Sequence, residues 1–165
     1  MNRLIVFTAL GSALVWGFAL PREEVSAQTT EDIVGTWTLV SVTVEQGGQK
    51  RDVMAPNPKG RLMFDNAGHY SVLTFRPDLP KFASNNRLTT TAEENSAVIA
   101  GSLSHYGTYS EVGNVLVFHI EYSTFPNWDG IDQKRPFALK GDDLTYTTPG
   151  STSAGATQLV WKRVR

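Results

Sequence analysis

Residues 105–122 read HYGTYSEVGNVLVFHIEY, two runs rich in β-branched and aromatic residues on either side of a Gly113-Asn114 pair. Such residues favour extended backbone, and a Gly-Asn pair between two runs of this kind is typical of a tight hairpin. In the second run Leu116, Phe118 and Ile120 recur with the period of a strand. The stretch therefore predicts an antiparallel pair of strands.

Segments of the same kind recur along the chain, separated by turns rich in Gly, Pro, Asn and Asp. The predicted strands are Val34–Glu45, Arg61–Phe64, His69–Phe75, His105–Glu111, Val115–Tyr122, Gln133–Leu139, Leu144–Thr147 and Gln158–Val164. Thr91 and Glu94 have the spacing of a capping box and predict one short helix over Ala92–Ala100. About eight short strands with few crossovers predict an all-β protein, an antiparallel up-and-down β-barrel.

The composition limits the partners of this barrel. The chain has 165 residues, of which 41% are hydrophobic and 19% charged, with a formal net charge of −1. This is ordinary globular composition, and no stripe of basic residues predicts a nucleic-acid partner. Cysteine is absent, which excludes disulfides, thiolate metal sites and a cysteine nucleophile.

The first 27 residues have the features of a secretory signal peptide. A short basic start, Asn2-Arg3, precedes the apolar run Leu4–Leu20, and Val25-Ser26-Ala27 places small residues where a signal peptidase cleaves. An uncleaved membrane anchor is the alternative, but the polar residues 28–31 favour cleavage. We therefore expect residues 28–165 to form one domain in the periplasm or the medium, with no stable membrane insertion after cleavage.

A set of short motifs, in order along residues 34–164, resembles the lipocalin-like domain family of small calycin-type β-barrels, most of them without an assigned reaction. The motifs are Gly35-Thr36-Trp37, Gly60-Arg61-Leu62-Met63-Phe64, Arg76-Pro77-Asp78, Tyr106-Gly107-Thr108-Tyr109, His119-x-Glu121, Phe125-Pro126-Asn127-Trp128-x-Gly130 and Leu159-Val160-Trp161. The resemblance implies a lipocalin-like barrel with Trp37 at its floor, covered by a basic side chain of the last strand (Lys162, Arg163 or Arg165). The chain departs from the pattern at Pro136, which predicts that the strand Gln133–Leu139 lies at an edge or bends.

His119 and Glu121 lie on the same face of the predicted strand Val115–Tyr122. If that face points inward, His119 faces Arg135 and Glu121 faces Gln133 in a polar cluster inside the barrel. If the opposite face points inward, the strand buries its apolar even-numbered residues and both polar side chains lie in solvent. No third ligand has a spacing that requires a metal, so neither a metal nor another cofactor is expected.

Further candidate ligand-binding residues are Tyr106 and Tyr109, which could orient a polar group or simply pack, and Trp128. The loop Phe125–Gly130 is expected to fold back, because two aromatic side chains are costly to leave in water. It either plugs one end of the barrel or lines its mouth, and in the second case Trp128 covers the ligand.

Two functions remain open for such a barrel. The first is an exported binding protein that holds a small hydrophobic or amphipathic molecule in the barrel cavity. The alternative is an enzyme of the isomerase or cyclase type that uses His119 and Glu121 as acid and base. The sequence shows no nucleophile elbow, phosphate loop or other diagnostic catalytic motif, so the catalytic residues are unknown and binding is favoured over catalysis.

Overall fold

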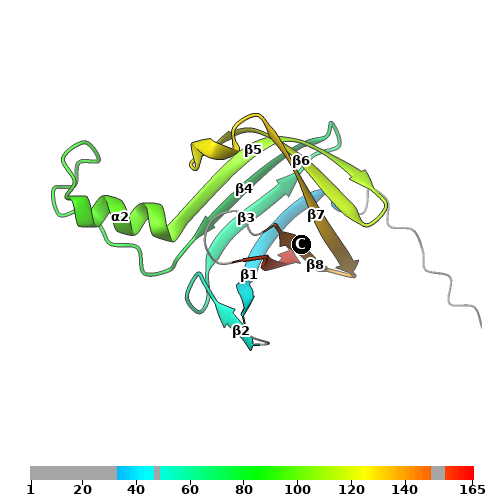
Figure 1. The fold of residues 1–165 in the computed structure, drawn as a ribbon, viewed down its shortest axis with the longest axis horizontal. Coiled ribbons are helices and arrows are strands. Elements are labelled where there is room, and N and C mark those ends of the chain that lie inside the picture. The colour runs from blue at the N-terminus through cyan, green and yellow to red at the C-terminus, as the bar shows by residue number, and fades with distance from the viewer. Residues whose placement is uncertain (1–32, 47–48, 150–154) are drawn as a thin grey trace, which may run out of the picture.

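The chain folds into a closed antiparallel β-barrel (Figure 1). This computed structural model describes residues 33–46, 49–149 and 155–165; the predicted signal peptide, residues 1–27, lies outside them. The strands of the described part are β1 (Gly35–Gln46), β2 (Gln49–Asp52), β3 (Lys59–Phe64), β4 (His69–Phe75), β5 (Ser102–Val112), β6 (Val115–Ser123), β7 (Ile131–Lys140), β8 (Asp143–Thr148) and β9 (Thr157–Arg163). Their order is β2-β1-β3-β4-β5-β6-β7-β8-β9, and β1 also pairs with β9, which closes the barrel. The predicted eight-stranded up-and-down barrel is confirmed.

β2 is the one strand that the sequence did not predict. Its four residues are all exposed, and it pairs only with Thr43–Gln46 at the far end of β1. It carries no apolar alternation because neither of its faces packs on the core, so periodicity gives no signal for it.

Trp37 closes one end of the barrel and is fully buried. Its indole N–H donates a hydrogen bond to the carbonyl of Ile33 at 2.9 Å, and the guanidinium of Arg163 lies 4.1 Å from the centre of its ring. The cation is attracted to the ring face, and its stem covers apolar surface. The expected floor is therefore present, and Arg163 is the basic residue that covers it.

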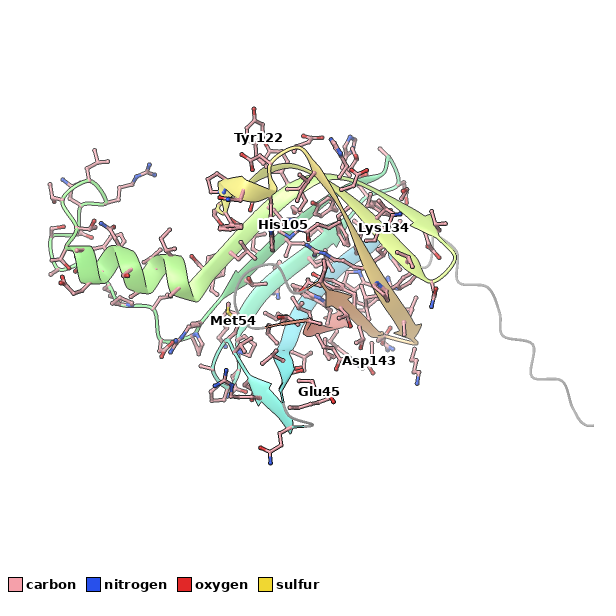
Figure 2. The ribbon with its side chains drawn as sticks, in the orientation of Figure 1. Glu45, Met54, His105, Tyr122, Lys134 and Asp143 are labelled. Atoms are coloured by element: carbon pink, nitrogen blue, oxygen red, sulfur yellow. The ribbon has the colours of Figure 1, made fainter. Side chains whose placement is uncertain are left out.

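A β-bulge between β5 and β6 changes which side chains point inward. Tyr106 pairs with Tyr122, but the next residue, Gly107, pairs with Ile120, so Glu121 is an extra residue on β6. Because side chains alternate along a strand, one extra residue reverses the faces beyond it. Tyr122 accordingly points away from the barrel, although the even-numbered residues before it point inward (Figure 2).

Pro136 does not place its strand at an edge, because β7 has β6 and β8 as neighbours. β7 pairs with β6 along residues 131–136 and with β8 along residues 137–140. Phe137 donates its N–H to Asn114, on the side of β6. Since successive residues of a strand point their N–H groups to opposite sides, position 136 faces β8, where proline has no N–H to donate. The pairing with β8 accordingly ends at Phe137.

The predicted helix is present as α2 (Ala92–Gly101), which leads directly into β5 and projects from one end of the barrel (Figure 1). Thr91 and Glu94 form the expected capping box, with the side chain of each accepting a hydrogen bond from the backbone N–H of the other. Within the described residues, no helix has the length and apolar character needed to cross a membrane.

Candidate functional site

A cavity of about 470 Å³ opens at the end of the barrel where α2 joins β5. Most of its wall is apolar and comes from strands that are distant in the sequence. The apolar lining residues are Val42, Val53, Met54, Val72, Val98, Ile99, Ala100, Leu103, Phe125, Trp128, Pro149 and Leu159. Figure 2 labels two lining residues, Met54 on the loop between β2 and β3 and His105 on β5. The size is that of a site for one small organic molecule.

The polar part of the wall centres on Arg135, whose side chain is only 1% exposed. Its Nη2 donates a hydrogen bond to Oε1 of Gln133 at 2.7 Å and a longer one to Nε2 of His105 at 3.4 Å. Nδ1 of His105 lies 2.9 Å from the hydroxyl of Tyr70. Arg135, His105 and Tyr70 thus form a buried chain of polar groups from β7 across β5 to β4.

The hydrogen bonds of this chain define the state of His105. A guanidinium donates hydrogen bonds but accepts none, so Nε2 of His105 must be the acceptor and Nδ1 must carry the hydrogen that it donates to Tyr70. Burial, and then the positive charge of Arg135, lowers the pKa of His105 to about 2. His105 is therefore a neutral imidazole over the physiological pH range.

Burial lowers the pKa of Arg135 and raises those of Tyr70 and Tyr146. An arginine side chain nevertheless keeps its proton in proteins. The two tyrosines stay protonated and neutral, because their pKa values move upward from an already high ordinary value. Arg135 is thus the single permanent charge among the described residues that line the cavity.

Two aromatic rings, rather than a carboxylate, surround this charge. The guanidinium carbon of Arg135 lies 4.5 Å from the ring centre of Phe118 and 5.2 Å from that of Tyr146. Such contacts stabilise a cation through the negative face of the ring. Nε of Arg135 and the hydroxyl of Tyr146 are nevertheless buried without a hydrogen bond of normal geometry, although the two side chains lie close enough to interact.

Two of the predicted ligand-binding residues, Arg135 and Trp128, line the cavity. Trp128 ends the short 3-10 helix η1 (Pro126–Trp128), and its ring contacts those of His105 and Phe125 edge-on, with centroids 5.8 and 5.6 Å apart. The loop therefore folds back over the barrel as expected. Tyr109 is also buried, but its hydroxyl donates to the carbonyl of Asp65 at 2.9 Å, and it packs in the core away from the cavity.

The other predicted residues lie on the outside. His119 is exposed, and its Nδ1 lies 2.8 Å from a carboxylate oxygen of Asp132. Glu121 is exposed in the bulge, and the ring of Tyr106 contacts that of Tyr122 at the surface in a tilted arrangement. Of the two alternatives for β6, the one in which His119 and Glu121 face Arg135 and Gln133 inside the barrel is therefore wrong, and the one that leaves both side chains in solvent is present. The register explains it, because Leu116 and Phe118, not His119 and Glu121, lie opposite Arg135 and Gln133. The acid–base pair of the enzyme alternative does not reach the cavity.

Three residues of the site, His105, Tyr70 and Tyr146, were not predicted from the sequence. The alternation of apolar residues along the strands could have predicted two of them. Tyr70 lies on the same strand face as Val72, and Tyr146 lies on the same face as Leu144. A polar or aromatic residue on such an inward face is a candidate for the cavity wall. The described residues contain no group of three or more His, Asp or Glu side chains placed to hold a metal ion.

A closed antiparallel barrel with one end covered by Trp37 and a ligand-sized cavity toward the other defines the class of small cup-shaped β-barrel proteins. The sequence model of the lipocalin-like domain family matches residues 34–164, and the chain belongs to this family. No curated protein matches the chain.

Solved structures with a similar fold include other small barrels. A redesigned β-barrel is 15% identical over 81% of this chain and 92% of its own, with a TM-score of 0.41. The wild-type fluorescent protein UnaG is 13% identical over 82% of this chain and 100% of its own, with a TM-score of 0.39. Fatty-acid-binding protein 1 of Echinococcus granulosus is 10% identical over 82% and 100% of the two chains, also with a TM-score of 0.39. At these identities no residue role carries over.

Proposed function

We propose that this protein is exported and binds one small hydrophobic or amphipathic molecule inside its barrel. The observation that carries the proposal is the cavity of about 470 Å³ with its largely apolar wall. Binding pockets for small molecules are concave, mostly apolar and equipped with a few polar groups that fix orientation. The cavity has this composition, with Arg135, His105, Tyr146 and Thr74 as its buried polar groups.

The apolar wall supplies the binding free energy. Moving an apolar molecule out of water contributes about 25 cal/mol for each Å² of surface buried. The sheet already holds the strands that form the wall in place, so little conformational entropy is lost when the cavity is filled. A hydrophobic molecule of suitable size is therefore expected to bind without rearrangement of the barrel.

The experiment uses the neutral dye N-phenyl-1-naphthylamine, whose fluorescence rises in apolar surroundings. We expect the purified protein to bind it in the micromolar range with one site per chain. Leu103→Trp places a larger side chain in the cavity and should weaken binding at least about tenfold, since it removes apolar contact area. Tyr106→Trp, on the outer face of the same strand, is the matched control and should bind as the wild type does.

Absence of dye binding to the folded wild-type protein would reject the proposed function. Equal affinities of the Leu103→Trp variant and the wild type would place the dye outside the cavity.

Export is tested separately, because it rests on residues 1–27 and not on the barrel. Expression of the full chain should yield protein in the periplasm or the medium whose intact mass corresponds to a start at Gln28. Retention of residues 1–27 in a membrane fraction would reject cleavage and favour an anchored domain.

A further inference from the structure

The cavity contains a positive charge that no side chain of its wall neutralises. Arg135 is 1% exposed, and the cavity lining described by the structure includes neither Asp nor Glu. Its hydrogen-bond partners, Gln133 and His105, are neutral acceptors. A buried charge is normally paired, because removal from water costs several kcal/mol. The barrel therefore maintains an unbalanced cation beside an apolar cavity.

Two hydrogen-bond donors beside this charge make no hydrogen bond of normal geometry, although the two groups lie close enough to interact with each other. They are Nε of Arg135 and the hydroxyl of Tyr146, both buried, and the guanidinium lies against the tyrosine ring. A buried donor without a partner is destabilising, so native structures rarely retain one without a reason. Two such donors at one positive charge are suited to an oxygen anion. The side chain of arginine matches the two oxygens of a carboxylate in particular.

We infer that the barrel binds a hydrophobic monocarboxylate, whose carboxylate pairs with Arg135 and Tyr146 and whose apolar chain fills the cavity toward α2. The inference rests on the proposed binding function and specifies its ligand class. A single negative charge balances the single cation, whereas a doubly charged phosphate head would leave a negative charge unpaired in the same apolar surroundings. Val98 and Ile99 of α2 line the far part of the cavity, and Ile99 is 72% exposed, which places the open end there.

The test compares amphiphiles that share one chain and differ in the head group. Decanoate, 1-decanol, decylamine and decyl phosphate are each used to displace N-phenyl-1-naphthylamine from the protein at pH 7.5. A charged hydrogen bond contributes about 1.5–3 kcal/mol, so decanoate should compete about tenfold to hundredfold more strongly than decanol. Decylamine should be the weakest competitor, because its positive charge meets that of Arg135.

Arg135→Met removes the charge at nearly constant volume and should abolish the preference for decanoate, while the affinities for the dye and for decanol change less than about threefold. Lys134→Met, the adjacent residue of β7 on the outer face, makes the same change in net charge and should keep the preference (Figure 2). Tyr146→Phe removes only the unpartnered hydroxyl and should weaken decanoate several-fold without weakening decanol. This variant keeps the test decisive if Arg135→Met does not fold.

The outcomes separate the two proposals. Binding of the dye and of decanol without a preference for decanoate would retain the proposed function and overturn the carboxylate. A preference that survives in Tyr146→Phe and Arg135→Met, or tighter binding of decyl phosphate than of decanoate, would also overturn it. If neither the dye nor any amphiphile binds, both proposals fail together.

Discussion

His105 should make the stability of the barrel depend on pH. Its pKa is about 2 in the folded protein and 6.5 without the fold, because burial and Arg135 disfavour the imidazolium. Below pH 6.5 the unfolded chain binds a proton that the folded protein does not bind, so stability falls as the pH falls. Each pH unit costs about 1.4 kcal/mol, and between pH 7 and pH 4.5 the loss is about 2.5 kcal/mol. Above pH 7 this contribution is constant.

The measurement is urea unfolding followed by circular dichroism at pH 7.0, 6.0, 5.0 and 4.5. His105→Gln removes the titrating group, and its stability should fall less than that of the wild type over this range, by about 2.5 kcal/mol. Tyr106→Trp, on the outer surface, changes no histidine or carboxylate and is the control, which should keep the wild-type loss. Carboxylates such as Asp65 and Asp78, whose pKa values are lowered by hydrogen bonds from the backbone of His69 and the side chain of Arg76, contribute equally to all three proteins. Equal losses in wild type and His105→Gln would refute the buried neutral imidazole.

Three further changes test the framework that holds the site. Trp37→Ala should lower the free energy of unfolding by about 3–5 kcal/mol, because the indole is fully buried; an unchanged urea midpoint would contradict its place at the floor. Gly107→Ala should cost about 3 kcal/mol or more, because its methyl group would overlap the carbonyl oxygen of His119; a wild-type melting temperature would mean that the β5–β6 bulge relaxes freely. Thr91→Ala should cost about 1 kcal/mol by removing the cap of α2, measured by helical circular dichroism and urea unfolding; no change in either would show that the cap contributes nothing.

The class of the fold follows from the sequence because most strands pack one face on the core and therefore alternate. Trp37, Leu39, Tyr70 and Val72 show this pattern, and each is buried. No comparable pattern in the sequence shows which residues of neighbouring strands pair with each other. The extra residue at Glu121 depends on how β6 meets Gly107 of β5, a contact between strands that one sequence does not display.

The site was only partly predictable for the same reason. Arg135 and Gln133 alternate with outward residues and could be placed inside the barrel together with Phe137. Whether His119 joined them depended on which face of β6 points inward. Apolar residues on both faces, Val115 and Val117 on one and Leu116, Phe118 and Ile120 on the other, left that choice open. His105 enters the site through its pairing with β4 and β6 and has no motif of its own.

The end of the β7–β8 pairing at Pro136 affects how fast a molecule can enter and leave the cavity. β7 has no paired residue on β8 along its described residues 131–136, whereas residues 137–140 close the wall with hydrogen bonds. Separating the two strands beside Arg135 therefore breaks no β7–β8 ladder hydrogen bond, and its free energy lies well below that of global unfolding. The cavity is already open beside α2, and this segment adds a second place where its wall can widen while the rest of the barrel stays folded. A bound molecule should therefore dissociate faster than the protein unfolds. Backbone amides of residues 131–135 that point toward β8 should exchange with solvent faster than the hydrogen-bonded amides of residues 137–140.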